Sequence, residues 1–526
     1  MNESALSEAS RHVSILDDVA GAAASHPLSY ETLDRLPAGV NRPPFDPARL
    51  RLGIVHLGCG AFHRAHQAVM TQRAIASELR SQGAAAAGTL DWGIAAASLR
   101  TPSILQSLKR QDGLYSVLER GPRSTRVEVV GTLRRLLFAP AEPAALRDLL
   151  ADPAIRMVTL TVTQAGYCID ASTGRLDQHH PDIVSDLRSS GTSTAIGLVV
   201  HGLGVRHAAG VPPPVVLSCD NLPGNGRLLR QACIDFAALK DDRLAGWIER
   251  HVQFPNSVVD RIVPATMLDD QYDASAALGL DDAVPVVAEP FLQWVIERFD
   301  GPRPKWEAAG AEFVSDVAPW EASKLRLLNG GHLAIAYLGI LAGHGTVADA
   351  VGDPLFADFA LRFMLDEQRP TLPPSGHDID AYAHQLLERW RNTGIQHRLD
   401  RIGRDGSGKV PDRLLASLRD NLRAGRPAPC TVLAVAAWIR CVIRRGPAGR
   451  GAPLIDTRSE RLRRLARKSG GHPGRLIDGL LDLQDVFSDD LRRDVGFRTA
   501  LLRAIETLDG SGANGATAQA LAEVPR

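Results

Sequence analysis

Short apolar runs alternate with longer amphipathic segments through roughly the first 300 residues of the chain. Six of these runs predict β-strands, at residues 52–58, 92–99, 126–133, 155–163, 213–221 and 285–290. Segments with helical periodicity lie between several of them, for example at 66–80 and 143–152. Strands that alternate with helices usually form a mostly parallel sheet with helices on both faces. The pattern therefore predicts an α/β domain.

The pattern changes after about residue 300, where helical periodicity prevails and few strand candidates remain. The helical segments lie at 324–343, 353–368, 378–390, 411–425 and 431–445. A stretch rich in Gly, Pro and charge, residues 299–306, is typical of a domain boundary. We expect a polar, Pro-ending N-terminal extension over 1–48, the α/β domain over 49–300, and a mostly α-helical domain over 301–526.

Composition and charge narrow the class of protein. The chain has 526 residues with 60 Lys+Arg and 60 Asp+Glu, which gives no electrostatic signature for nucleic acid or an anionic membrane. Six cysteines without a CxxC pair do not predict a disulfide framework, and the acidic N-terminus does not resemble a secretory signal. No unbroken apolar run is long enough to span a bilayer. We therefore expect a cytoplasmic enzyme that acts on a small molecule.

The first predicted strand ends in a glycine-rich turn, Gly58-Cys59-Gly60-Ala61-Phe62-His63. This is the G-x-G-x-x-G spacing with His in the third position, and it is followed by a predicted helix. Small residues let such a turn approach a pyrophosphate at the helix N-terminus. The spacing predicts a dinucleotide site that includes Gly58, Gly60, Ala61, Phe62 and His63. A tight strand-to-helix turn without a ligand is the alternative.

The end of the second predicted strand bears on the choice of cofactor. NAD-binding folds usually place an acid there for the ribose hydroxyls, whereas residues 98–103 read Ser-Leu-Arg-Thr-Pro-Ser. Arg100 and the hydroxyls could accept a 2′-phosphate, although Arg100 could equally be a solvated charge. We expect NAD as the cofactor, with use of NADP possible.

Three other kinds of site find no support in the sequence. No Tyr is followed four residues later by Lys, as short-chain dehydrogenases require. No HExxH motif or Cys/His cluster predicts a metal, and His63-x-x-His66 alone does not. The run from Gly403 to Lys409 imitates a phosphate loop, but Val410 occupies the position of the metal-binding hydroxyl. We expect a metal-free site.

Polar residues on an otherwise apolar helix form the second candidate, from Lys324 through Asn329 to His332. Burying such groups is costly unless they are paired or used. Asn329 and His332 are three residues apart and share a helical face, whereas Lys324 lies further round but has a long stem. A desolvated lysine could act as a general base toward an alcohol. A helix N-terminus with Lys324 paired to Glu321, and His332 in the core, is the alternative.

These residues, with others, resemble the mannitol dehydrogenase family, whose long-chain polyol dehydrogenases include mannitol 2-dehydrogenase and fructuronate reductase. The matching segments are 58–66, 218–226, 254–256 with 259–261, and Lys324…Asn329…His332. The resemblance implies a Rossmann-like N-terminal domain, a helical C-terminal domain, a cleft between them and hydride transfer without a metal.

The same resemblance implies roles for individual residues. Lys324 would be the general base, and Asn221 and Asn329 the paired amides that bind the reacting oxygen, a role similar to an oxyanion hole. His332 would orient the substrate or the lysine. Asp260 and Glu321 would be acids near the site, Glu321 as a possible route for the proton. Two departures from the family are Gln164, where many members have Glu, and Pro102-Ser103, where some have acids.

The substrate depends on one end of the molecule, because a terminal carboxylate needs Arg or Lys whereas a hydroxymethyl does not. Arg398, Arg401 and Lys409 are the candidate cations, unless they are ordinary loop charges. Arg398 and Lys409 resemble the fructuronate reductase branch, and Arg401 resembles the mannitol branch. We expect D-mannonate and D-fructuronate, with D-mannitol and D-fructose as the alternative. A non-catalytic dinucleotide sensor, the other alternative, would be expected to lack the lysine or an amide.

Overall fold

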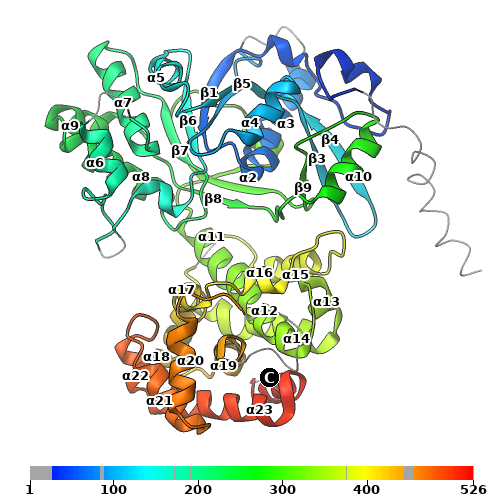
Figure 1. Cartoon of the computed structure of the whole chain (residues 1–526), viewed down its shortest axis with the longest axis vertical. Coiled ribbons are helices and arrows are strands. Elements are labelled where there is room, and N and C mark those ends of the chain that lie inside the picture. Colours follow the sequence, from blue (N-terminus) through cyan, green and yellow to red (C-terminus); the bar gives the residue numbers. More distant parts are fainter. Residues whose placement is uncertain are drawn as a thin grey trace, which may run out of the picture. The chain divides into compact units, whose positions relative to one another are not determined.

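A computed structural model of the chain describes residues 26–82, 88–170, 173–188, 192–374, 376–443 and 454–524. The chain forms two compact units, Met1–Val317 and Ala318–Arg526 (Figure 1). The part of the expected N-terminal extension before residue 26 lies outside the described residues. Each unit is described below by itself.

A five-stranded parallel sheet forms the centre of the N-terminal unit. Its order is β5 (Leu133–Phe138), β2 (Gly93–Ser98), β1 (Leu52–Leu57), β6 (Met157–Leu160) and β7 (Val215–Ser218). The chain runs outward from β1 in one direction and then returns to β6 on its other side. The strand order therefore reverses between β1 and β6, which is where open α/β sheets bind their ligands. The predicted Rossmann-like fold is confirmed.

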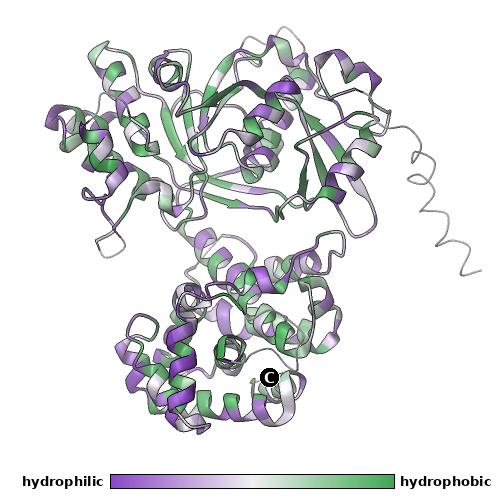
Figure 2. Ribbon diagram, in the orientation of Figure 1, coloured by the Kyte–Doolittle hydropathy of each residue, from purple (hydrophilic) through white to green (hydrophobic). Residues whose placement is uncertain are grey.

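Both faces of this sheet are buried under helices. Along β1, Val55 and Leu57 pack into one apolar core, which includes α5 (Pro143–Ala151) and α7 (Ala195–Ala208). Ile54 points the other way, into a core shared with α3 (Gln67–Gln82). The sheet strands are accordingly apolar along most of their length (Figure 2). Remaining helices of this unit are α2 (Ala61–Ala65), α4 (Ser103–Arg110), α6 (Pro181–Arg188), α8 (Asn225–Ala238), α9 (Asp242–His251) and α10 (Leu268–Leu278).

Two three-stranded sheets complete the N-terminal unit. One has the order β11 (Glu312–Val314), β10 (Gln293–Glu297), β8 (Ser257–Asp260), and the other β4 (Thr125–Val130), β3 (Tyr115–Arg120), β9 (Val286–Ala288). The pattern of apolar runs did not predict β3, β5, β8, β10 or β11, and it merged β4 with the start of β5. The charged residues in β3 and β5 interrupt the apolar runs on which the prediction rests.

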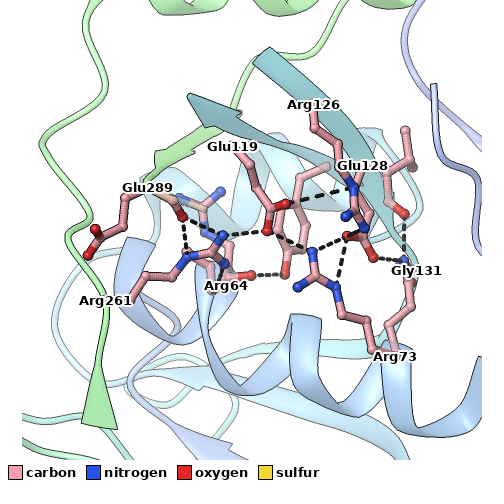
Figure 3. Close-up of polar contacts among 12 residues, drawn as sticks. Arg64, Arg73, Glu119, Arg126, Glu128, Gly131, Arg261 and Glu289 are labelled. Carbon is pink, nitrogen blue, oxygen red and sulfur yellow. Dashed lines mark hydrogen bonds and ion pairs between the residues drawn. The ribbon is translucent and has the colours of Figure 1, made fainter. Parts of the chain in front are cut away.

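A buried ionic network explains the charges at the end of β3 (Figure 3). Glu119 accepts hydrogen bonds from Arg73 on α3, at 2.6 Å, and from Arg261 just after β8. Arg73 also contacts Glu128 on β4 at 2.7 Å. The Arg261 side chain is 0% exposed, and its other donors bind the carbonyls of Ala65 and Glu289. Arg261, part of a family motif, therefore joins the sheets and helices around it.

Every element assigned among the described residues from Ala318 on is helical. The first helical run comprises α11 (Ala318–Ser323), the π-helix η5 (Lys324–Asn329) and α12 (Gly330–Ala342). Two further π-helices, η6 (Phe363–Gln368) and η8 (Pro411–Leu415), both contact η5. The other helices are α13 (Val347–Gly352), α14 (Pro354–Arg362), α15 (Ile379–Trp390), α16 (Leu399–Ile402), α17 (Gly406–Val410), α18 (Ala416–Arg423), α19 (Pro429–Ile443), α20 (Ser459–Lys468), α21 (Pro473–Leu481), α22 (Asp489–Arg493) and α23 (Val495–Glu523). The expected helical C-terminal domain is confirmed.

The run Ala318–Ala342 is 25 residues long, and its most apolar 18-residue window, with a mean hydropathy of 1.3, satisfies the length and composition criteria for a membrane span. The sequence pattern predicts no apolar run long enough to span a bilayer, whereas this run meets the criteria. In the structure, 67% of its most apolar window is buried. Its apolar side chains pack with those of α19 in the core of the C-terminal unit, as those of a core helix do.

Candidate functional site

The glycine turn after β1 lies at the point where the strand order reverses. Gly58 has φ +109°, and a Cβ there would lie 2.1 Å from the carbonyl oxygen of Thr161, just after β6. Only glycine tolerates both the positive φ and the close approach of this carbonyl oxygen. Gly60 then caps α2, in which Ala61 and Phe62 are half-buried and His63 is buried. The predicted turn thus brings the backbone between the carboxyl ends of β1 and β6.

A cavity of about 510 Å³ opens at this turn. Its walls come from the β1 turn, the end of β2, the end of β6 with η3 (Gln164–Tyr167), and the start of α7. The lining includes Gly58, Gly60, Ser98, Arg100, Thr101, Ser103, Thr161, Asp182, Ser193 and Thr194. The structure therefore places Gly58, Gly60 and Arg100 in one cavity. A glycine cradle, hydroxyls and one cation suit the phosphates and ribose of a dinucleotide.

His56 and His63 stack beneath the turn, with ring centroids 3.4 Å apart and planes 13° from parallel. Nε2 of His56 lies 3.0 Å from the Gly58 carbonyl oxygen and 2.9 Å from Oγ1 of Thr161, and its Nδ1 lies 2.8 Å from Oγ1 of Thr159. Burial lowers the pKa of His56 to about 3, so the ring is neutral. His56 supports the turn from below. A histidine inside an apolar strand was the available signal, and sequence reasoning missed it.

Asp182 is the carboxylate among the residues that line the cavity. It lies on α6, far along the chain from the β2 end where an acid was sought, and its side chain is 60% exposed. Its Oδ2 lies 4.0 Å from Nδ1 of His180. Asp182 and Arg100 line the same cavity, so its wall carries both a carboxylate and a guanidinium.

Asp220 holds the loop after β6 in a strained conformation. Thr163, which precedes η3, has φ +64°, a region that β-branched residues rarely adopt. The buried carboxylate of Asp220 accepts hydrogen bonds from the backbone of Val162, at 3.0 Å, and Thr163, at 2.8 Å, and from the Tyr167 hydroxyl. Burial raises the pKa of Asp220. The loop that carries Gln164 is thereby fixed to the end of β7.

Asn225 and Gly226, also in the Ser218–Gly226 motif, make close contacts with the segments next to β7. Asn225 donates to the carbonyls of Asp220, at 2.9 Å, and Ser257, at 2.8 Å. A Cβ at Gly226 would lie 2.4 Å from the Pro255 carbonyl oxygen. Asn221, the predicted catalytic amide, follows Asp220 and is exposed. The predicted Asp260 ends β8 and is buried.

In the C-terminal unit, the π-helix η5 begins at Lys324 and ends at Asn329. The Gly330 N–H donates to the carbonyl of Leu325, an i→i−5 bond that widens the turn. Residues five apart are stacked in such a turn, so Lys324 and Asn329 lie on one side of the helix. The α-helical period had placed Lys324 further round. Both side chains are half-buried, as is Glu321 on α11.

Two glycines after Asn329 let neighbouring helices approach. A Cβ at Gly330 would lie 2.7 Å from the carbonyl oxygen of Arg413 on η8, and one at Gly331 would lie 2.5 Å from Cη2 of Trp390 on α15. Any residue with a Cβ at either position would prevent the corresponding contact. The glycine pair therefore brings η8 and α15 against the helix that carries the candidate catalytic residues.

His332 lies in a cluster of rings. Its centroid is 5.0 Å from Trp390 and 4.8 Å from His397. None of the residues that the structure describes hydrogen-bonds to Nε2 of His332, Nδ1 of His397 or Nε1 of Trp390, although all three atoms are buried. Burial lowers the pKa of His332 well below its usual value and that of His397 to about 4. Three neutral polar groups are therefore available to a ligand.

The predicted substrate-binding cations have different surroundings. Arg398 forms a two-point ion pair with Asp400, at 3.0 and 3.1 Å, and is 57% exposed. Lys409 donates to the carbonyls of Ile402, at 3.2 Å, and Arg404, at 2.6 Å, and burial lowers its pKa. Arg401 lies exposed on α16. Sequence reasoning did not select Arg389 or Arg413, whose charges also lower the pKa of His332.

Comparison with known proteins agrees with these features. Residues 52–308 match the mannitol dehydrogenase Rossmann domain, and residues 316–509 match the mannitol dehydrogenase C-terminal domain. The chain is 40% identical over 485 residues to an uncharacterized oxidoreductase of Escherichia coli, YeiQ, covering 91% of this chain and 96% of that protein. It is 38% identical over 481 residues to the D-mannonate oxidoreductase of the same organism, covering 90% and 96%.

A solved structure of Pseudomonas fluorescens mannitol 2-dehydrogenase, in a ternary complex with NAD and D-mannitol, is also similar. It has a TM-score of 0.82 and 36% identity, over 94% of this chain and all of that one. Two family models in succession, relatives aligned over nine-tenths of the chain, and a shared fold lead to one conclusion. The chain belongs to the mannitol dehydrogenase family.

Proposed function

We propose that the protein is an NAD-dependent dehydrogenase that interconverts D-mannonate and D-fructuronate. Family membership supports an oxidoreductase that acts on an alcohol group of a polyol or sugar acid. The observation that carries the proposal is the placement of Lys324 and Asn329 on one side of η5, in the helical run that continues to His332 with its unpartnered Nε2. A base, an amide and a neutral imidazole together suit an alcohol that loses a proton and a hydride.

NAD would bind at the cavity beside Gly58 and Gly60. The cradle that a Cβ would fill and the hydroxyls of Ser98, Thr101 and Thr194 fit its phosphates and ribose. The solved relative contains NAD, which supports the same cofactor here. When bound, NAD supplies the hydride acceptor.

Each polar residue of the C-terminal group has one task in this proposal. Lys324, as the general base, takes the proton of the substrate hydroxyl. The Asn329 amide donates to the same oxygen as it gains negative charge. His332, held neutral by burial, binds a neighbouring hydroxyl. Asn221 of the N-terminal unit, Asp260 and Glu321 keep the roles that the family resemblance predicts for them.

D-mannitol and D-fructose are the second candidate pair, supported by the similarity to the mannitol 2-dehydrogenase structure. The test is to follow reduced nicotinamide by its near-ultraviolet absorbance with D-mannonate, D-mannitol and their ketones. We expect the highest kcat/KM for the acid pair. Higher kcat/KM for the neutral pair would favour mannitol 2-dehydrogenase activity. NAD binding without turnover of any aldonate or polyol would instead support a dinucleotide sensor.

A further inference from the structure

Arg413 is a half-buried cation without a partner. It lies on η8, and in the described part of the chain no carboxylate lies within 4.0 Å of its guanidinium and no hydrogen bond holds it. Burial lowers the pKa of Arg413. Two other cations of the unit have carboxylate partners: Arg326 pairs with Asp420 at 2.8 Å, and Arg398 pairs with Asp400. A desolvated guanidinium without an anion is costly, which points to a ligand that supplies one.

The position of Arg413 connects it with the ring cluster. Its carbonyl packs on Gly330, the residue after Asn329, and η8 contacts η5 and α12. The guanidinium lies close enough to His332 and Lys409 for its charge to lower the pKa of both groups. Arg413 is therefore a neighbour of His332, on the side of the cluster that η8 covers.

The charges around Arg413 favour the binding of an anion. Arg389 also acts on His332 and His397. The acid that acts on Arg413 is Asp412, which is exposed. An incoming anion would thus meet the Arg413 guanidinium and the unpartnered N atoms of His332, His397 and Trp390.

We propose that Arg413 binds the terminal carboxylate of the sugar acid and so makes the protein prefer an aldonate to a neutral polyol. The inference rests on the proposed function and names the group that selects its substrate. The ketone of D-fructuronate lies on the carbon next to the chain end that is opposite the carboxylate. The carboxylate should therefore bind away from Lys324 and toward the neighbourhood of His332, on which the charge of Arg413 acts. The planar fork of Arg413 can bind both carboxylate oxygens.

Arg413→Met tests the proposal, because methionine keeps part of the apolar stem and removes the charge. We expect KM for D-mannonate to rise by about ten- to a hundredfold, with kcat/KM for D-mannitol nearly unchanged. Arg413→Lys should recover part of the loss, since a point charge replaces the fork. Arg404→Met, which removes an exposed cation on the same segment, is the matched control and should resemble the wild type. Thermal unfolding would check that each variant folds.

Three results would overturn the inference. These are equal losses on the acid and neutral substrates, a selective loss in Arg398→Met rather than in Arg413→Met, and a wild type that prefers D-mannitol. A wild type that turns over neither substrate pair would instead contradict the proposed function. If Arg413→Met does not fold, Arg413→Lys alone decides, through its ratio of kcat/KM for the two substrates.

Discussion

Lys324 and Asn329 stand at the two ends of one π-helical segment and lie on the same side of the helix. In an ordinary α-helix, residues five apart would be separated by about 140° around the axis. The wider π-turn removes most of this separation. One helical run thereby presents a proton acceptor and a hydrogen-bond donor in the same direction.

Replacing the candidate base should affect the chemical step alone. We expect Lys324→Ala to lower kcat by about a hundred- to ten-thousandfold, because the alcohol proton would lose its acceptor. The Kd for NAD should stay nearly constant, since the cavity that we propose for NAD is lined by residues of the N-terminal unit. Steady-state rates and NAD titration measure the two effects, with the exposed Lys468→Ala as control. A parallel loss of NAD affinity would contradict the role of a base.

The glycine pair should be intolerant of a methyl group where Trp390 approaches. Gly331→Ala would place a Cβ 2.5 Å from Cη2 of Trp390. We expect the free energy of unfolding to fall by about 1–3 kcal/mol, as in other overpacked cores. Gly352→Ala, at a helical position with open space around the new Cβ, is the matched control and should fold at least as well. Denaturant titration compares the two, and equal stabilities would refute the close contact.

Cofactor preference should respond to two side chains of the cavity. We expect the wild type to use NADP measurably, with a preference for NAD below about a thousandfold, or about 4 kcal/mol. Asp182→Asn should raise kcat/KM for NADP relative to NAD by about two- to fivefold, the range expected for an exposed charge pair. Arg100→Ala should lower the same ratio. If neither variant shifts it, other residues select the ribose.

The buried histidine beneath the glycine turn should make the protein sensitive to acid. His56 has its pKa lowered to about 3 by burial, so below about pH 6.5 the unfolded chain binds a proton that the folded chain does not. The free energy of unfolding should therefore fall as the pH drops from about 6.5 toward 3, by up to about 1.4 kcal/mol per pH unit from this group. In His56→Gln this part of the slope should disappear. His472→Gln, at an exposed histidine, should keep it.

Chelation should leave the activity unchanged, because the proposed base is a lysine rather than a metal-bound water. We expect equal rates before and after dialysis against EDTA. Activity that disappears with the chelator and returns with zinc would replace the lysine mechanism with a metal-assisted one.

Sequence patterns were sufficient for much of the fold and for one wall of the cavity. Four strands of the central sheet are apolar runs. In contrast, β5 has Arg134 and Arg135 directly after its first residue, and it is an edge strand, where charges can reach solvent. The Gly58 turn follows from local spacing. Asp182 comes to the same cavity only through tertiary folding. The π-turn at Lys324 has no periodic signature, and Arg413 reads in the sequence as an ordinary polar position on a helix.

The lining of the cavity at the Gly58 turn comes mostly from strand ends, loops and helix starts, and its polar side chains lie outside the two apolar cores of the N-terminal unit. Positions of this kind can change without removing the packing that folds the protein. A combinatorial library at Arg100, Ser103 and Asp182 would therefore sample cofactor choice at nearly constant thermostability. Because the cavity side chains lie outside the apolar cores, the chain is a suitable scaffold for redox enzymes that must use either NAD or NADP.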